Sequence, residues 1–216
     1  NGAGDGLRRE WFEATAGEVL DPSRGLFVSK DGNRTLQPSP HSATTAGADH
    51  LSHFALLGRI AGLALYHREP LNVSLSTAFV KAVLGYTITP ADLEAVDPAL
   101  GQRIRFVRDS TTDEELAGAD LVFEDDSNDA AIVYESKEEQ RPTTELKEGG
   151  AGLAVTQANK DEYLQLLAEH RLVGAIGPQV AAFRNGLGVF VDEDLRATVR
   201  TCCSVADVQL LLCGVV

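Results

Sequence analysis

Residues 50–67 read HLSHFALLGRIAGLALYH. Their apolar positions fall on nearly every side of a helix with 3.6 residues per turn, which predicts a buried central helix with Asp49 as its N-cap. Gly58 and Gly62 lie four residues apart and therefore on one face. Because glycine in a helix costs roughly 1 kcal/mol relative to alanine, the pair predicts the close approach of a second backbone. The apolar positions are Leu51, Phe54, Leu57, Ile60 and Leu65.

The segments before and after this helix carry helix and turn signals of their own. Apolar spacing predicts a helix over residues 7–20, and the turn at 31–33 predicts a hairpin joining 26–28 to 35–37, with 38–48 as a loop. Ser76 is expected to start a short helix that Gly85 ends. Two further helices are expected at Thr89-Pro90 and Asp97-Pro98, because each pair places a capping side chain before a proline in the first turn.

The second half of the chain begins with an acidic region. Asp and Glu dominate residues 109–149, where apolar residues at 121–123 and 132–134 predict two small strands between solvated loops. Thr156 is then expected to cap a helix that runs to about Val173, and Val180, Phe183 and Leu187 mark another. The predicted fold is α+β and mostly helical. A small mixed subdomain, residues 97–175, is expected to be inserted into a larger helical body made of residues 1–96 and 176–216.

Composition narrows the classes of partner. The net charge of −13 makes nucleic acid an improbable partner, because an acidic surface repels phosphate. The longest apolar run, residues 54–66, is broken by Arg59 and is too short to cross a bilayer, so no membrane partner is expected. Three cysteines without a Cys-x-x-Cys spacing fit an intracellular protein, cytoplasmic or nuclear. We expect no cofactor.

Metal binding and nucleophilic catalysis each have candidate residues that we weighed. His50 and His53 lie three apart, but no recognised set of metal ligands accompanies them, so no metal site is predicted. The acidic run 124–126 lacks the glycine and terminal glutamate of a calcium loop. Cys213 lies in an apolar run, and burial raises the pKa of a thiol, so none of the three cysteines, including Cys202 and Cys203, is predicted to be catalytic.

A series of short motifs runs in order through almost the whole chain. Together they resemble the amino-terminal lobe of HECT-type ubiquitin ligase domains. No single motif is specific, whereas their order and spacing are. The motifs are LRREWF (7–12), DPSRGLF (21–27), HLSHF (50–54), GR (58–59), GLAL (62–65), VDP (96–98), ELKEGG (145–150), VT (155–156), EY (162–163) and LLLCG (210–214).

The resemblance implies a thioester relay. A ubiquitin-conjugating enzyme would dock on the small subdomain, and ubiquitin would pass to a cysteine on a second, carboxy-terminal lobe and then to a substrate lysine. That nucleophile is expected beyond Val216, and Gly214 is expected at the hinge between the lobes. Protein substrates would be bound by other regions. The residues that match the docking groove are Leu100, Ile104, Leu121, Tyr163 and Leu167.

Alternatives stay open at this point. The five matched side chains are equally explained as core residues, since their spacing places them on single helix faces in either case. The chain is interpreted first as the docking lobe of an active ligase. On its own, this chain is expected to be inactive. The second interpretation is a catalytically dead module that binds a conjugating enzyme. The third is an acidic helical interaction domain without a link to ubiquitin.

Overall fold

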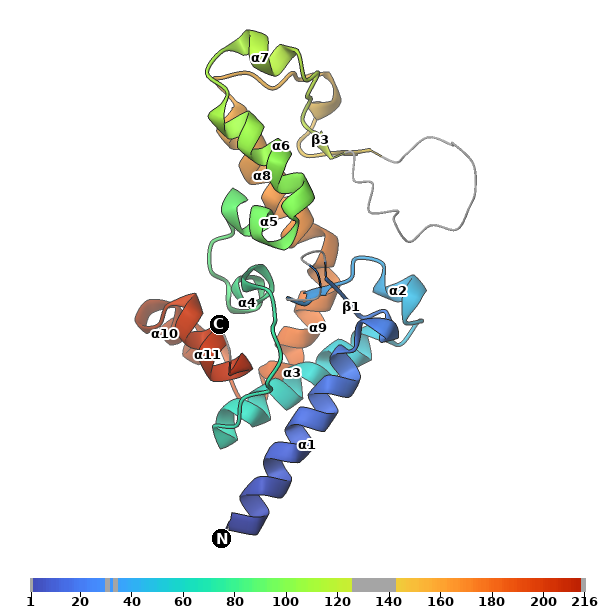
Figure 1. Cartoon of the computed structure of the whole chain (residues 1–216), viewed down its shortest axis with the longest axis vertical. Helices are drawn as coiled ribbons and strands as arrows, with labels where there is room; N and C mark the ends of the chain where they lie inside the picture. The colour runs from blue at the N-terminus through green and yellow to red at the C-terminus, as the bar shows by residue number, and fades with distance from the viewer. Residues whose placement is uncertain (1, 30–31, 33–34, 126–142, 215–216) are drawn as a thin grey trace.

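Helix α3 (His50–His67) lies in the middle of the larger part of the molecule, beside helix α9 (Gly177–Leu187) (Figure 1). The computed structural model describes residues 2–29, 32, 35–125 and 143–214 of the chain. Within these residues, α3 and α9 pack together more extensively than any other pair of elements. The predicted central helix is therefore confirmed, and α9 is the element against which it packs.

Glycines allow the α3–α9 contact to be close. A Cβ atom on Gly58 would overlap the carbonyl oxygen of Phe183 and lie 2.9 Å from the backbone nitrogen of Leu187. A Cβ atom on Gly186 would likewise overlap the carbonyl oxygen of Ala55. The predicted approach of a second backbone is thus confirmed at Gly58, where it offsets the helical cost of glycine. Gly62 instead faces the side chain of Phe190.

The other elements of the larger part surround this pair. The predicted antiparallel pairing is confirmed in part: Val28 pairs with Gln37, but Phe27 pairs with Pro38, which was expected in the loop. Residues 31 and 33 of the predicted turn lie outside the described residues. Ser76 accepts a hydrogen bond from the backbone nitrogen of Phe79 and caps the next helix, which ends at Gly85 as expected. The elements are α1 (Gly2–Leu20), η1 (Pro22–Arg24), β1 (Phe27–Val28), β2 (Gln37–Pro38), α2 (Ser42–Thr45), α4 (Thr77–Leu84), α10 (Glu193–Cys202) and α11 (Val205–Cys213).

The smaller part has a hydrophobic core of its own, built mainly on helices α6 and α8. Both predicted Asp/Thr-Pro starts are confirmed: Pro90 opens α5, and Asp97 accepts a hydrogen bond from the backbone nitrogen of Leu100 at the start of α6. The elements are α5 (Pro90–Val96), α6 (Pro98–Asp109), α7 (Asp113–Ala117), β3 (Glu124–Asp125), β4 (Thr144–Glu145), η3 (Gly150–Gly152), α8 (Lys160–Leu172) and η4 (Gly174–Ile176).

Several sequence predictions need correction. Thr156 was expected to cap helix α8, but the helix begins at Lys160. The backbone nitrogen of Thr156 instead donates a hydrogen bond to the side chain of Asn159, in a turn before the helix. The Asp49 side chain makes no capping hydrogen bond to α3. The expected loop 38–48 contains α2, and the acidic region contains α7. The strand expected at 132–134 lies outside the described residues.

The last helix packs only one side against the larger part. Val208, Leu212 and Cys213 are buried in its core, whereas Leu210 and Leu211 are 55% and 62% exposed. One side of the apolar run 208–213 is therefore buried, and the side that carries Leu210 and Leu211 faces outward. The carbonyl of Leu212 accepts a hydrogen bond from the nitrogen of Leu71, and Gly214 follows with φ of +77°.

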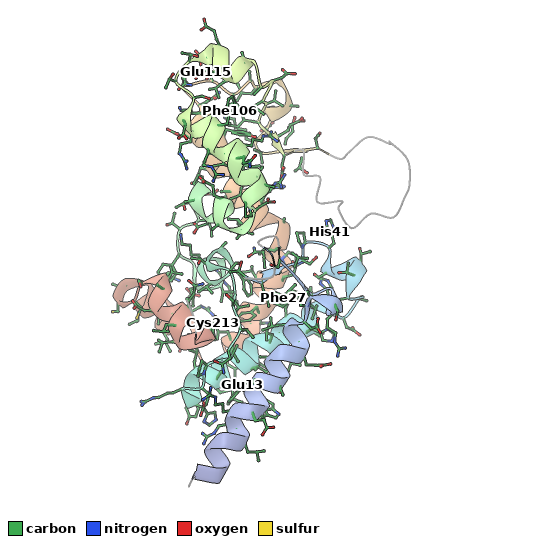
Figure 2. All side chains as sticks on the ribbon, viewed as in Figure 1. Glu13, Phe27, His41, Phe106, Glu115 and Cys213 are labelled. Carbon is green, nitrogen blue, oxygen red and sulfur yellow. The ribbon has the colours of Figure 1, made fainter. Side chains whose placement is uncertain are left out.

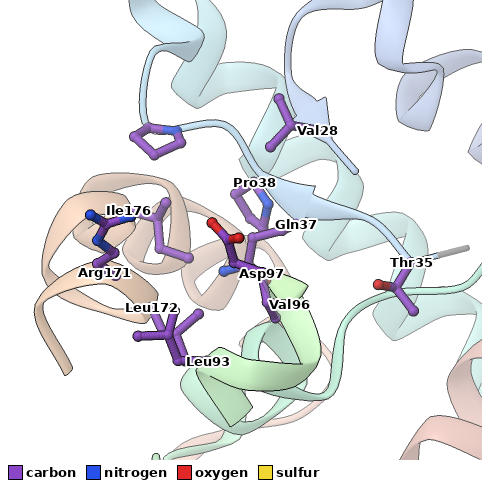
Figure 3. Close-up of a pocket in the computed structure, with 11 residues that line it drawn as sticks. Val28, Thr35, Gln37, Pro38, Leu93, Val96, Asp97, Arg171, Leu172 and Ile176 are labelled. Atoms are coloured by element: carbon purple, nitrogen blue, oxygen red, sulfur yellow. The ribbon is translucent and has the colours of Figure 1, made fainter. Parts of the chain in front are cut away.

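The two parts meet at a seam shown in Figure 3, between β2 on one side and α5, α8 and η4 on the other. The seam holds a cavity of about 40 Å³, which has room for two or three water molecules at most. Most of the residues that line it are apolar, and Gln37, Asp97 and Arg171 add polar groups. We therefore regard it as a small packing gap at the joint between the two parts and place no ligand there.

Candidate functional site

A groove of about 480 Å³ opens on the smaller part of the molecule. Phe106 lies on its α6 side, at the end of the molecule away from Cys213 (Figure 2). The groove combines apolar surface with charged groups of both signs. Its lining residues are Arg103, Phe106, Ala119, Asp120, Leu121, Val122 and Glu124.

Helix α6 forms one wall. Its apolar stripe faces inward: Ile104 and Val107 are 1% and 0% exposed. Arg103 and Phe106 stand three residues apart and so share a face that borders the groove. Phe106 is 46% exposed. The Lys160 ammonium group donates to the carbonyl oxygens of Arg108 and Ser110, which holds the carboxyl end of α6 against the start of α8.

The opposite wall is segment 119–124, a turn at residues 119–120 followed by residues 121–124, which are held by backbone hydrogen bonds. The nitrogen of Phe123 donates to the carbonyl oxygens of Gly150 and Leu153, and the nitrogen of Val155 donates to the carbonyl of Leu121. Asp120 turns the chain into this segment with φ of +49°. Both walls therefore rest on regular backbone contacts, which makes the groove a preformed feature.

An ion pair anchors the strand at the end of this wall. Asp125 is 1% exposed and accepts hydrogen bonds of 2.8 and 3.0 Å from Nε of Arg171 on α8. His170 lies 3.7 Å from the same carboxylate. Removing one member of a buried pair costs about 3–5 kcal/mol, so this contact fixes the strand firmly. On the outer face of α6, a hydrogen bond to Asp109 raises the pKa of Arg108, which also pairs with Glu94.

The structure brings the five groove residues predicted from the sequence into one cluster. Ile104, Tyr163 and Leu167 are almost completely buried, at 1%, 0% and 2% exposed, and belong to the core of the smaller part. Leu100 and Leu121 are partly buried against this core, and Leu121 also lines the groove. Burial favours core packing for the first three. As partner-binding residues, all five stay a prediction.

Sequence reasoning missed the residues that line the groove other than Leu121. Phe106 offered a signal, because it is an aromatic residue outside the apolar stripe of an amphipathic helix. Arg103, Asp120 and Glu124 offered none, since charged residues occur throughout this region. Their proximity depends on the fold of residues 119–124 against α6.

The three cysteines, His50 and His53 are not among the residues that line the groove. Cys213 is 1% exposed, and burial raises the pKa of its thiol, which disfavours the reactive thiolate. Cys202 is exposed and Cys203 half-buried. His50 contacts the Ser42 hydroxyl, and His53 the carbonyl of Asp49. Among the described residues, no group of three side chains is arranged to hold a metal ion, and no helix has the length and apolarity needed to cross a membrane.

Comparison with known sequences assigns the family. The pattern of the HECT-domain (ubiquitin-transferase) family matches residues 13–216. The chain belongs to the HECT-domain family. It is 34% identical over 194 residues to the E3 ubiquitin-protein ligase HACE1 of Danio rerio, a match that covers 90% of this chain and 20% of that protein. It is 35% identical over 210 residues to the E3 ubiquitin-protein ligase UPL2 of Arabidopsis thaliana, covering 97% of this chain and 5% of that protein.

Membership in the HECT-domain family confirms the resemblance inferred from the motifs. Over the described residues, the observed fold is mostly helical with two small antiparallel sheets, which agrees with the predicted α+β class. The chain spans about a fifth or less of the length of these curated relatives. The division at residues 97 and 175 stays a prediction, since the core of the smaller part also includes Ile88 and Leu93.

Proposed function

We propose that this HECT-domain segment docks a ubiquitin-charged conjugating enzyme in the groove between α6 and residues 119–124. The observation that carries the proposal is the exposed ring of Phe106 beside an open groove with a rigid backbone. Partner-binding hot spots combine an aromatic anchor with a pocket that excludes water. The groove supplies the aromatic side chain and apolar surface that a bound partner would shield from water, and it lies on the smaller part, where the family resemblance implies docking.

The proposal extends to the relay that docking serves. Ubiquitin would leave the conjugating enzyme by attack of a cysteine thiolate outside these 216 residues, forming a new thioester and releasing the thiol of the conjugating enzyme. The amine of a substrate lysine would then attack that thioester, forming an amide bond and releasing the cysteine thiol. The buried thiol of Cys213, with its raised pKa, supports the view that no nucleophile for this reaction lies at the end of α11. Gly214, with a positive φ, suits the hinge.

The test compares two exposed aromatic residues. Phe106→Ala is expected to weaken binding of a conjugating enzyme by about 1–3 kcal/mol, as for an aromatic interface anchor. Tyr66→Ala on α3 is the matched control, because Tyr66 is 73% exposed and lies on the larger part. Both affinities are measured by titration calorimetry with one conjugating enzyme. Equal affinities of the two variants would contradict docking in this groove.

Two other interpretations are separated by related measurements. A catalytically dead binding module would bind the conjugating enzyme through Phe106, yet the natural full-length protein would transfer no ubiquitin to lysine. An interaction domain without a link to ubiquitin would bind no charged conjugating enzyme at all. The docking proposal is favoured over the latter by family membership over residues 13–216.

A further inference from the structure

We propose that this chain withholds its own lysines from ubiquitin transfer. Lys81, Lys147 and Lys160 are the lysines of the described residues, and the ammonium group of each is held by acceptors within the fold. The inference rests on the proposed function, because it concerns which lysine amines that reaction uses. It goes beyond docking, since it concerns how the protein distinguishes substrate lysines from its own.

Arginine rather than lysine supplies the exposed cations of this chain. Only five of the 19 basic residues in the sequence are lysines. Lysine is mostly exposed in proteins, yet the side chains of Lys81 and Lys147 are 18% and 30% exposed, and Lys160 is half-buried. A guanidinium stays protonated at neutral pH and is no nucleophile, so an exposed arginine accepts no ubiquitin. The exposed arginines of the described residues are Arg9, Arg24, Arg59, Arg68, Arg105 and Arg108.

Lys160 makes the strongest of the three lysine contacts. Its Nζ atom donates hydrogen bonds of 2.9 and 2.6 Å to the carbonyl oxygens of Arg108 and Ser110. These carbonyls lie at the carboxyl end of α6, where the last carbonyl groups of a helix lack intrahelical partners and a cation is favourable. The Lys160 amine therefore has two acceptors to leave before it reaches a partner in solution.

Lys81 is held by a carboxylate that is itself mostly buried. Its Nζ atom lies 2.7 Å from Oδ2 of Asp92, whose side chain is 8% exposed. The same oxygen of Asp92 accepts hydrogen bonds from the backbone nitrogen and the hydroxyl of Thr89. Moving Lys81 outward would leave a buried charge without its cation, which is strongly unfavourable.

Lys147 makes the weakest of the three contacts. Its Nζ atom lies 2.8 Å from Oε1 of Glu162 and 4.0 Å from the centroid of the Phe123 ring. Because the Glu162 side chain is 53% exposed, water competes for both charges of this pair. Lys147 is therefore the lysine whose protection depends most clearly on one replaceable residue.

The chemistry of transfer makes these contacts an obstacle. The nitrogen of an accepting lysine attacks the carbonyl carbon of the ubiquitin thioester, so that an amide bond forms, the carbon–sulfur bond breaks and the leaving sulfur takes up the proton that the nitrogen loses. An ammonium group has three N–H donors and no lone pair. Before it attacks, a lysine has to leave its acceptors, lose a proton and extend toward the thioester. A lysine held in the fold therefore reacts more slowly than an exposed lysine of a substrate.

The first experiment measures the availability of each amine without ubiquitin. The 216-residue chain is treated with the N-hydroxysuccinimide ester of acetic acid, and mass spectrometry follows the acetylation of each lysine. Arg59→Lys adds an exposed reference lysine on α3. Lys160 is expected to react at least about ten-fold more slowly than this reference, because its hydrogen bonds are charge-assisted. Equal rates at Lys160 and at the reference lysine would overturn the inference.

The second experiment releases one lysine without moving it. Glu162→Ala removes the carboxylate that pairs with Lys147, and acetylation of Lys147 should become about two- to five-fold faster, the range of an exposed ion pair. Glu148→Ala is the matched control, because it removes the same charge from an exposed residue next to Lys147 in the sequence. It should leave the rate at Lys147 unchanged. An equal increase in both variants would assign the effect to net charge and overturn the role of the contact.

The third experiment uses the natural full-length protein with activating enzyme, conjugating enzyme, ubiquitin and ATP. Lys30→Arg and Lys137→Arg remove the two lysines that lie outside the described residues, and mass spectrometry maps the lysines that carry ubiquitin. Little ubiquitin is expected on Lys147 in this background, and Glu162→Ala should increase it. If Glu162→Ala leaves the amount on Lys147 unchanged, protection by this contact is overturned.

The outcomes separate this inference from the proposed function. If Phe106→Ala leaves the affinity for a conjugating enzyme unchanged, docking in the groove falls, whereas the acetylation rates still decide whether the lysines are held. If the full-length protein transfers ubiquitin to no lysine of any protein, the relay falls together with the protection that it requires. If it modifies other proteins and carries ubiquitin on Lys81, Lys147 and Lys160 as readily, only the inference falls.

Discussion

Replacing Gly186 by alanine tests the contact on which the larger part is built. The added Cβ would overlap the carbonyl oxygen of Ala55 and lie 2.9 Å from the backbone nitrogen of Arg59, whereas ordinary contact begins at 3.4 Å. Both atoms belong to the backbone of α3, so no side chain is able to rotate away. Helices α3 and α9 would have to separate along their whole contact.

Two opposing free energies decide the result. Alanine gains about 0.5–1 kcal/mol over glycine in a helix interior. Overpacking a tight core costs about 1–3 kcal/mol and more where the backbone is the obstacle. We therefore expect Gly186→Ala to lower the free energy of unfolding by at least about 1–2 kcal/mol. For a chain of this size, each kcal/mol lowers Tm by about 2–4 °C.

Gly17→Ala is the matched control, because Gly17 lies in helix α1 with no atom within 4 Å of the position of a new Cβ. The same substitution should raise Tm there by a degree or more, through helix propensity alone. Thermal melts followed by circular dichroism, with urea midpoints as a second measure, give both values. A Gly186→Ala protein as stable as Gly17→Ala would refute the close contact of α3 with α9.

Four further predictions follow from burial. Tyr163→Ala should lower the free energy of unfolding by about 3–5 kcal/mol, because the side chain is completely buried, and an unchanged melting temperature would contradict its place in the core. A chain cut before Val208 should have a lower urea midpoint than one ending at Gly214. Each buried apolar side chain of α11 contributes about 1.5–3 kcal/mol to the free energy of unfolding, and the Gln209 amide donates to the carbonyl of Leu75. Equal midpoints would mean that α11 is a frayed end. Iodoacetamide at pH 8 should label Cys202 well before Cys213, because the raised pKa of Cys213 leaves little thiolate at that pH. No thiol-sensitive ubiquitin adduct should form when this chain is incubated with activating enzyme, conjugating enzyme, ubiquitin and ATP. An adduct that is lost in Cys213→Ser would contradict both expectations.

Local chemistry explains why much of the helical framework was predictable. A cap followed by proline, as at Thr89-Pro90 and Asp97-Pro98, satisfies free backbone groups within a few residues, so the sequence alone marks the helix start. Helix α7 had a similar signal that was overlooked: Thr112 and Glu115 form a capping box inside the acidic region. The family could also be inferred from the sequence, because the order of the motifs can be read without knowing how the chain folds.

Helix periodicity also limits what an apolar run can bury. The run 208–213 is continuous in the sequence, yet Leu210 and Leu211 point outward because a helix turns by about 100° per residue and α11 rests on one side only. Only the packing of α11 against α4 and α3 decides which side that is.

The candidate site shows the same division. Spacing alone placed Leu100 with Ile104 and Tyr163 with Leu167 on shared helix faces, and the structure gathers them in one cluster. Whether such a face meets its own core or a partner depends on what lies opposite, which spacing does not contain. Tertiary structure buried Tyr163 beneath the surface and left Arg103 at the groove, because helix α8 packs against α6 from a distant point in the chain and residues 119–124 form the opposite wall. The residues of a helix determine which side chains share a face, but the whole fold determines which element packs against that face.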